Sequence, residues 1–158
     1  MPESSPNNYF SHSDIEPMLR EVLDSGGEFE LAPHGTSMLP LIKEGRDTVT
    51  LVKPSGRLKL DDIALYKRKS GQFVLHRVVK VFQKEYDMCG DNQSVPERGV
   101  KDSQIIAVVS YLRLNGKLYR ADSKKLRLYV NSRRNLKLRR IVLGVKARIP
   151  KFNIKTNK

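Results

Sequence analysis

Ser37 lies in a seven-residue segment whose composition could make its hydroxyl a nucleophile. The segment reads His34-Gly35-Thr36-Ser37-Met38-Leu39-Pro40. Gly35 permits a backbone angle that other residues avoid, and Pro40 fixes its own φ and favours an extended Leu39. A rigid bend of this kind would expose the Ser37 hydroxyl and leave its N–H free to face a substrate carbonyl. A solvated loop serine is the alternative, and the segment alone favours neither interpretation.

A nucleophilic serine needs a base, and the chain contains three histidines. His12 lies in a polar N-terminal segment and His34 in the bend itself, whereas His76 lies within 73–82, the longest run with the composition of a β-strand. A strand would hold the His76 ring in a fixed direction, which a general base requires. A neutral imidazole, with an ordinary pKa of about 6.5, can accept the hydroxyl proton at neutral pH. The position of His76 alone fits equally well a non-catalytic histidine that lies in a strand and makes one hydrogen bond.

The elements that would position these residues are mainly β. Ser13 and Glu16 have the spacing of a capping box, and Gly26-Gly27 would end the short helix that follows. Alternating or β-branched residues predict strands at 28–31, 48–52, 62–66, 73–82, 84–89 and 105–112. Asn115-Gly116 is a strong hairpin signal, whereas residues 95–99, which contain a proline and a glycine, are expected to form a loop.

Five short motifs, in this order, resemble the successive sequence boxes of one serine peptidase superfamily, which contains the type I signal peptidases and the self-cleaving domains of LexA-type repressors. Each motif is weak alone, and their order gives the resemblance its specificity. They cover roughly residues 28–114: Gly35-Thr36-Ser37-Met38-Leu39-Pro40, Asp61-Asp62-Ile63-Ala64-Leu65-Tyr66, Leu75-His76-Arg77-Val78-Val79, Gly90-Asp91-Asn92 and Ile105-Ile106-Ala107-Val108-Val109.

The resemblance implies a mainly β fold, a LexA/signal peptidase-like β-barrel with a short N-terminal helix. It implies that Ser37 is the nucleophile and His76 the base, as in the serine–histidine branch of endoplasmic-reticulum, archaeal and sporulation-type signal peptidases. The Ser37 N–H would be the oxyanion donor, helped by Gly35 or Thr36. The same box would contribute its other residues, Met38 and Pro40, to the oxyanion and substrate-binding wall.

Three carboxylates are candidates to orient His76. Asp91, in the Gly-Asp-Asn motif, is the nearest motif match, and Glu97 stands where the histidine branch has an acid. These two rank close together, with Asp102 behind them. A carboxylate on the far ring nitrogen would hold the imidazole and stabilise its charged form. Each acid could instead be a turn carboxylate that binds local N–H groups. No metal or cofactor is expected, since the single cysteine, Cys89, excludes a cysteine-based zinc cluster.

The charge of the chain is concentrated at its C-terminal end. The net charge is +13 over 158 residues, and residues 113–158 contain 16 Lys or Arg and a single acid, Asp122. An excess of this kind implies an anionic partner or merely solubility. Leu126, Leu128 and Val130 alternate as in a strand, whereas apolar residues from Leu138 to Val145 repeat at helical spacing. We expect a basic, helical C-terminal tail.

We therefore expect a loose N-terminus at 1–12, a peptidase domain at 13–121 and a basic extension at 122–158. With no membrane span or secretory signal in the sequence, and only 36 residues before Ser37, we expect a stand-alone cytoplasmic member of the superfamily. The tail could bind an anionic membrane surface, although a solvated helix packed on the domain is slightly favoured. Nucleic-acid binding comes third, because no recognised readout pattern is present.

The function expected from this sequence is a serine endopeptidase that cleaves a protein or leader-peptide precursor through an acyl-enzyme. The resemblance implies small residues on the acyl side of the cleaved bond. The alternative is a regulatory module, non-catalytic or self-cleaving, that binds a membrane surface or nucleic acid through its tail. The retained serine and histidine favour the enzyme.

Overall fold

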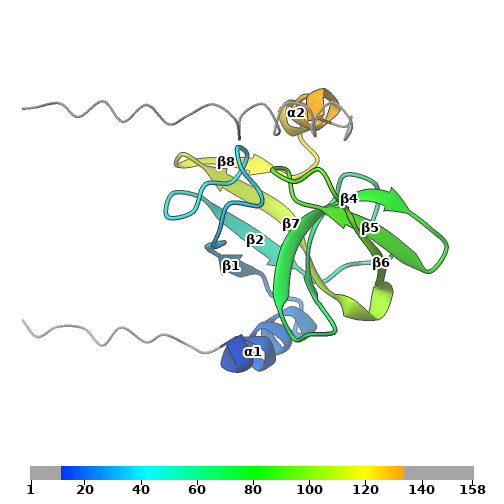
Figure 1. The fold of residues 1–158 in the computed structure, drawn as a ribbon. Helices are drawn as coiled ribbons and strands as arrows, with labels where there is room; N and C mark the ends of the chain where they lie inside the picture. The colour runs from blue at the N-terminus through cyan, green and yellow to red at the C-terminus, as the bar shows by residue number, and fades with distance from the viewer. Residues whose placement is uncertain (1–11, 134–158) are drawn as a thin grey trace, which may run out of the picture.

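The computed structural model describes residues 12–133 of the chain (Figure 1). It is mainly β, as the sequence predicts, with two α-helices and one short 3₁₀ helix. In chain order the elements are α1 (His12–Asp24), β1 (Phe29–Leu31), β2 (Thr48–Val52), β3 (Ile63–Lys67), β4 (Phe73–Val81), β5 (Glu85–Cys89), β6 (Glu97–Lys101), the 3₁₀ helix η1 (Asp102–Gln104), β7 (Ile105–Leu114), β8 (Lys117–Arg120) and α2 (Lys124–Arg133).

All eight strands belong to one antiparallel sheet, whose order is β1-β2-β7-β3-β4-β5-β6. The eighth strand, β8, pairs with the C-terminal part of β7, whereas β3 pairs with its N-terminal part. The expectation of a closed barrel is not met within residues 12–133, because the strand order has two ends, β1 and β6. The sheet is bent instead. Its register shifts at Thr50/Leu51, Leu65/Tyr66 and Val78/Lys80, and such irregularities increase local twist and bend a strand.

Local sequence accounts for most of these elements. In β2, Val49 and Leu51 are fully buried while the alternate residues Thr48, Thr50 and Val52 are half-buried, which is the alternation of a strand with one core face. Asn115 and Gly116 both have positive φ, at 48° and 77°, and form the tight turn between β7 and β8 that their sequence predicts.

The expected loop at 95–99 is wrong in its second half, since β6 begins at Glu97. Pairing to β5 outweighs the turn signals, with Met88 opposite Glu97 and Tyr86 opposite Val100. Gly99 takes a positive φ of 72° in the middle of this strand, beside a register shift. The glycine that suggests a loop therefore marks an irregularity within a strand.

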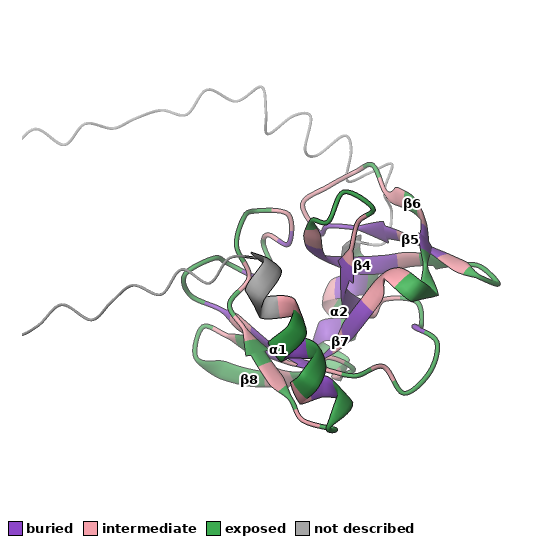
Figure 2. Cartoon of the chain, turned by 90° about the horizontal axis from the view of Figure 1, so that it is seen from below, coloured by how far each residue is buried: buried purple, intermediate pink, exposed green. Residues whose placement is uncertain are grey.

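Two apolar clusters lie along the bent sheet. One contains residues of α1, β2 and β7, and the other surrounds two buried tyrosines, Tyr66 and Tyr86. Figure 2 shows buried residues running along β4, β5 and β7, while α1 and β8 are largely exposed. The helices α1 and α2 lie at opposite ends of the molecule (Figure 1).

The ambiguous segment 126–130 is helical. Leu126 and Val130 are four residues apart and each is 6 % exposed, whereas Leu128 between them is 71 % exposed. This pattern is the i, i+4 face of a helix packed on the body of the protein. The predicted amphipathic stretch from Leu138 to Val145 lies outside the described residues. No helix within residues 12–133 is both long enough and apolar enough to span a bilayer.

Candidate active site

The bend that carries Ser37 connects β1 to β2 and is held from both sides. On its outer side, Glu44 accepts a hydrogen bond from the Gly35 N–H at 3.0 Å and pairs with His34 Nδ1 at 2.9 Å. Gly35 has a φ of 89°, a conformation that glycine adopts without steric cost. On its inner side, the buried Met38 anchors the bend in the core. Ser37 itself is half-buried.

The Gly-Asp-Asn motif holds the backbone of Ser37. The Asn92 N–H donates to the Ser37 carbonyl oxygen at 2.8 Å. A Cβ at Gly90 would lie 2.5 Å from that same oxygen, so only glycine allows the two loops to approach this closely. The sequence motif thus fixes the position of the candidate nucleophile through its backbone.

The N–H groups predicted from the sequence to bind the oxyanion differ in whether another acceptor already occupies them. The Gly35 N–H is used by Glu44, so it is not available to a substrate in this arrangement. Within the described part of the chain, the Ser37 N–H has no acceptor. A backbone N–H beside the nucleophile is the group that stabilises a developing oxyanion. Pro40 follows a cis peptide bond and lies outside the cavity that Ser37 lines.

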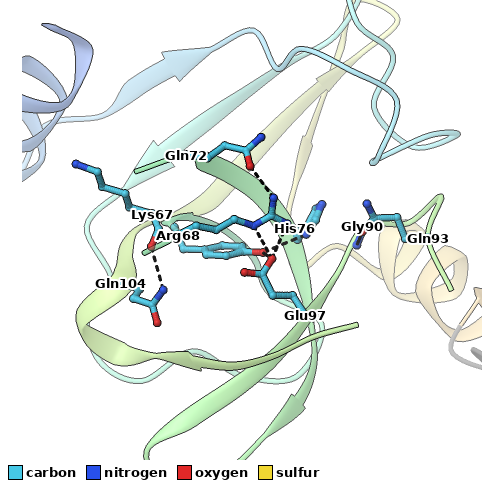
Figure 3. A network of polar contacts seen from close by, with 9 residues as sticks. Lys67, Arg68, Gln72, His76, Gly90, Gln93, Glu97 and Gln104 are labelled. Atoms are coloured by element: carbon cyan, nitrogen blue, oxygen red, sulfur yellow. Dashed lines mark hydrogen bonds and ion pairs between the residues drawn. The ribbon is translucent and has the colours of Figure 1, made fainter. Parts of the chain in front are cut away.

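His76 lies in β4, opposite Ala64 of β3, and is only 3 % exposed. Its Nδ1 atom is 3.2 Å from the hydroxyl of Tyr66. That hydroxyl donates to Oε2 of Glu97 at 2.7 Å, and the same oxygen accepts from Nε and Nη2 of Arg68 at 2.8 and 2.6 Å. Figure 3 shows Arg68, from the loop that follows β3, and His76, from β4, on the same side of the sheet as Glu97.

The pKa directions follow from this packing. Burial, with the nearby Arg68 charge, lowers the pKa of His76 to about 4, against the attraction of Glu97 and Asp91. Partial burial acts to raise the pKa of Glu97, but hydrogen bonds from Arg68 and Tyr66 outweigh it and hold that pKa below its usual range. Burial and the Glu97 carboxylate raise the pKa of Tyr66. At neutral pH the site therefore contains a neutral imidazole, a neutral phenol and an ionised Glu97.

Asp91 forms an ion pair with Arg77. Its two carboxylate oxygens accept from Nε and Nη2 of Arg77 at 2.9 and 2.8 Å, and Tyr129 of α2 donates to it at 3.3 Å. Both members of this ion pair are buried. Successive strand residues point to opposite faces, so Arg77 draws Asp91 to the face of β4 opposite the His76 ring.

Asp102 lies away from this site. It accepts a hydrogen bond from the Tyr86 hydroxyl and pairs with Arg57 at 3.4 Å. It lines a separate cavity of about 420 Å³ beside α1, whose walls include neither Ser37 nor His76. Of the three candidate acids, only Glu97 is connected to His76, and it is connected through Tyr66.

Ser37 and His76 line one cavity of about 220 Å³, although 39 positions separate them in the sequence. Within residues 12–133 no hydrogen bond joins their side chains, which is common for catalytic pairs in structures without substrate. The apolar part of the cavity wall includes Met38, Ile42 and Leu75. A second cavity of about 510 Å³ lies beyond His76, between Arg68 and residues 92–97. The imidazole therefore lies where the two cavities meet.

Sequence reasoning missed Tyr66 and Arg68. Tyr66 ends the second of the five sequence motifs, but nothing in that motif assigns its hydroxyl a role. Its link to Glu97 spans 31 positions and depends on the register of β3, β4 and β6. In the part of the chain that the structure describes, no group of three or more His, Cys, Asp or Glu side chains is arranged to hold a metal ion.

Comparisons with protein-family models, with curated proteins and with solved structures find no match to this chain.

Proposed function

We propose that this chain is a serine endopeptidase of the signal peptidase and LexA-like kind, with Ser37 as nucleophile and His76 as general base. One observation carries the proposal: a serine in a restrained bend and a buried neutral imidazole line the same cavity. The bent antiparallel sheet, with the serine between β1 and β2 and the histidine on β4, supports the same fold family.

The reaction uses these two side chains in sequence. The Ser37 oxygen attacks the carbonyl carbon of the peptide bond while His76 takes the hydroxyl proton. The Ser37 N–H stabilises the resulting oxyanion. His76 then gives the proton to the leaving amine, which departs and leaves an acyl-enzyme. Water, deprotonated by the same imidazole, hydrolyses the ester and restores the serine.

The first half of β4 offers a place for the substrate. β3 pairs with β4 from Phe73 to Arg77, whereas the pairing of β5 with β4 runs from Arg77 to Val81. Residues 73–76 of β4 line the cavity together with Pro33 and Gly35. An extended peptide added as a strand here would pass between Ser37 and His76. This favours a polypeptide substrate over a small ester.

The test is labelling of the full chain by a fluorophosphonate, which reacts with activated serines. We expect one adduct, on Ser37, and its loss in Ser37→Ala and in His76→Ala. Ser94→Ala and His12→Ala are the matched controls, since Ser94 lies in the neighbouring cavity and His12 begins α1, away from the bend and from β4 in the sequence. Labelling that persists in Ser37→Ala, or that never occurs in the folded protein, contradicts the proposal.

A further inference from the structure

The Tyr66 hydroxyl lies between two acceptors and has one proton to give. It is 2.7 Å from Glu97 Oε2 and 3.2 Å from His76 Nδ1. A phenol can donate one hydrogen bond and accept others. Which neighbour receives the proton decides which nitrogen of the imidazole carries a hydrogen.

The charge of Glu97 decides which neighbour receives the Tyr66 hydroxyl proton. An ionised carboxylate accepts hydrogen bonds and cannot donate, and Arg68 donates to Glu97 Oε2 through two nitrogens, at 2.8 and 2.6 Å. The Tyr66 proton therefore points to Glu97. The Tyr66 oxygen can then only accept a hydrogen bond from His76. The donor of that hydrogen bond must be the N–H at Nδ1 of the imidazole. The lone pair of the ring is consequently on Nε2.

We propose that Tyr66 is a positioning residue that holds His76 in the Nδ1–H tautomer, and that Glu97 acts on the imidazole only through this hydroxyl. The inference rests on the proposed function for its catalytic meaning, because the Nε2 lone pair is what His76 needs to accept the Ser37 proton. The hydroxyl replaces the carboxylate that directly orients the histidine in a serine–histidine–acid triad.

The surroundings of His76 fit this arrangement. The charged groups that act on the ring are Arg68, Glu97 and Asp91. Asp91 is held by Arg77, and Arg68 is held by Glu97 and by Gln72, whose side chain accepts from Nη1 at 2.7 Å. With these charged side chains committed to other partners, the Tyr66 oxygen is the group on Nδ1. The tyrosine and the imidazole pack at 57°, with ring centroids 6.1 Å apart.

The tautomer can be measured without any substrate, from the nitrogen chemical shifts of the imidazole in the full-length protein labelled with ¹⁵N-histidine. His12→Gln and His34→Gln leave a single histidine signal to assign. We expect the Nδ1–H tautomer in the wild-type chain at pH 7. An Nε2–H tautomer in the wild-type chain overturns the proposal, even if every variant fails to fold.

The variants test the direction of each hydrogen bond. Tyr66→Phe should abolish the preference for Nδ1–H. Glu97→Ala should invert it, because the freed phenol can then donate to Nδ1, whereas Glu97→Gln keeps an acceptor and should keep Nδ1–H. Tyr86→Phe is the matched control, since Tyr86 is equally buried in the same cluster and donates to Asp102 instead. A tautomer unchanged by both Tyr66→Phe and Glu97→Ala overturns the proposal.

The catalytic consequence is a second, separate readout. Tyr66→Phe should lower kcat at least about 10-fold with little change in KM, because a misplaced tautomer removes the base without removing substrate contacts. Adding Glu97→Ala to Tyr66→Phe should cost little more, since Glu97 acts through the lost hydroxyl. A large additional loss overturns the indirect role of Glu97. Absence of peptidase activity in a wild-type chain that shows the Nδ1–H tautomer contradicts the proposed function and leaves the tautomer assignment standing.

Discussion

Gly90 lies against the Ser37 carbonyl oxygen so closely that a Cβ on the glycine would be 2.5 Å from it. This contact, with the hydrogen bond from the Asn92 N–H to the same oxygen, joins the loop after β5 to the bend that carries the nucleophile. The two segments are far apart in sequence, and neither forms regular structure at the contact. The position of Ser37 therefore depends on a glycine more than fifty residues away.

Gly90→Ala should displace the bend and impair the site. The new methyl group meets backbone atoms, which cannot move aside as a flexible side chain could, so we expect a loss of stability of about 1–3 kcal/mol. We also expect fluorophosphonate labelling of Ser37 to fall in the protein that remains folded. Urea denaturation and the labelling rate measure the two effects. Gly56→Ala is the control, because a Cβ at Gly56 would contact nothing within 4 Å.

Asp91 is predicted to contribute to stability through its ion pair. Removing one partner of a buried, hydrogen-bonded pair leaves an uncompensated charge and costs about 3–5 kcal/mol. Asp91→Asn should therefore lower the free energy of unfolding strongly, and Arg77→Met combined with Asp91→Leu should recover much of the loss. Urea denaturation of the single and double variants measures the coupling.

The same variants separate a structural from a catalytic role for Asp91. If Asp91 acts through Arg77, the double variant should label on Ser37 at a rate close to that of the wild-type chain. A stable double variant that no longer reacts with the fluorophosphonate would assign Asp91 a direct part in the chemistry.

The sequence predicts the elements well where local pattern and tertiary packing agree. The hairpin at Asn115-Gly116 and the alternating strand at 48–52 depend on nearest neighbours, and the structure has both. β6 was missed because Pro96 and Gly99 are typical of loops. Its pairing partner, β5, supplies the hydrogen bonds that make it a strand. Pairing between strands is not encoded in the local pattern.

The candidate site shows the same division. Ser37 and His76 could be selected from residue type and motif, and the structure brings both to one cavity. The partners of the three candidate acids could not be selected. Asp91 and Glu97 each pair with an arginine that the sequence analysis left without a role, Arg77 and Arg68. These pairs depend on strand register and on which face of a strand each side chain takes.

Helix α2, at the start of the basic extension, should be part of the folded domain. Leu126 is 6 % exposed and belongs to the same cluster as residues of α1 and β7, so Leu126→Ala should cost about 2–5 kcal/mol. Leu128→Ala is the matched control, because Leu128 is 71 % exposed and its loss should stay within about 0.5 kcal/mol. Thermal or urea unfolding measures both. Equal, small effects would show that α2 does not pack on the sheet.

The acid limb of peptidase activity should lie near the pKa of His76. Burial, followed by the Arg68 charge, lowers that pKa to about 4. Protonated imidazole cannot accept the Ser37 proton, so kcat/KM should fall as the pH drops through about 4 and stay level from there towards neutrality. Arg68→Gln removes a cation that disfavours the imidazolium, while the Asp91 carboxylate, which is held by Arg77, continues to favour it. In that variant the limb should move to higher pH.

Unfolding at low pH could imitate this limb, so circular dichroism at each pH is the necessary control. His12→Gln supplies a second control, because His12 begins α1 rather than lying in β4, and this variant should leave the limb in place. A wild-type limb near 6.5, the pKa of a solvated imidazole, would mean that His76 is not the buried base. The upward shift in Arg68→Gln has a second use. Since Arg68 touches Glu97 and not His76, a shift without loss of the Nδ1–H tautomer would show that the arginine acts on the imidazole by charge alone.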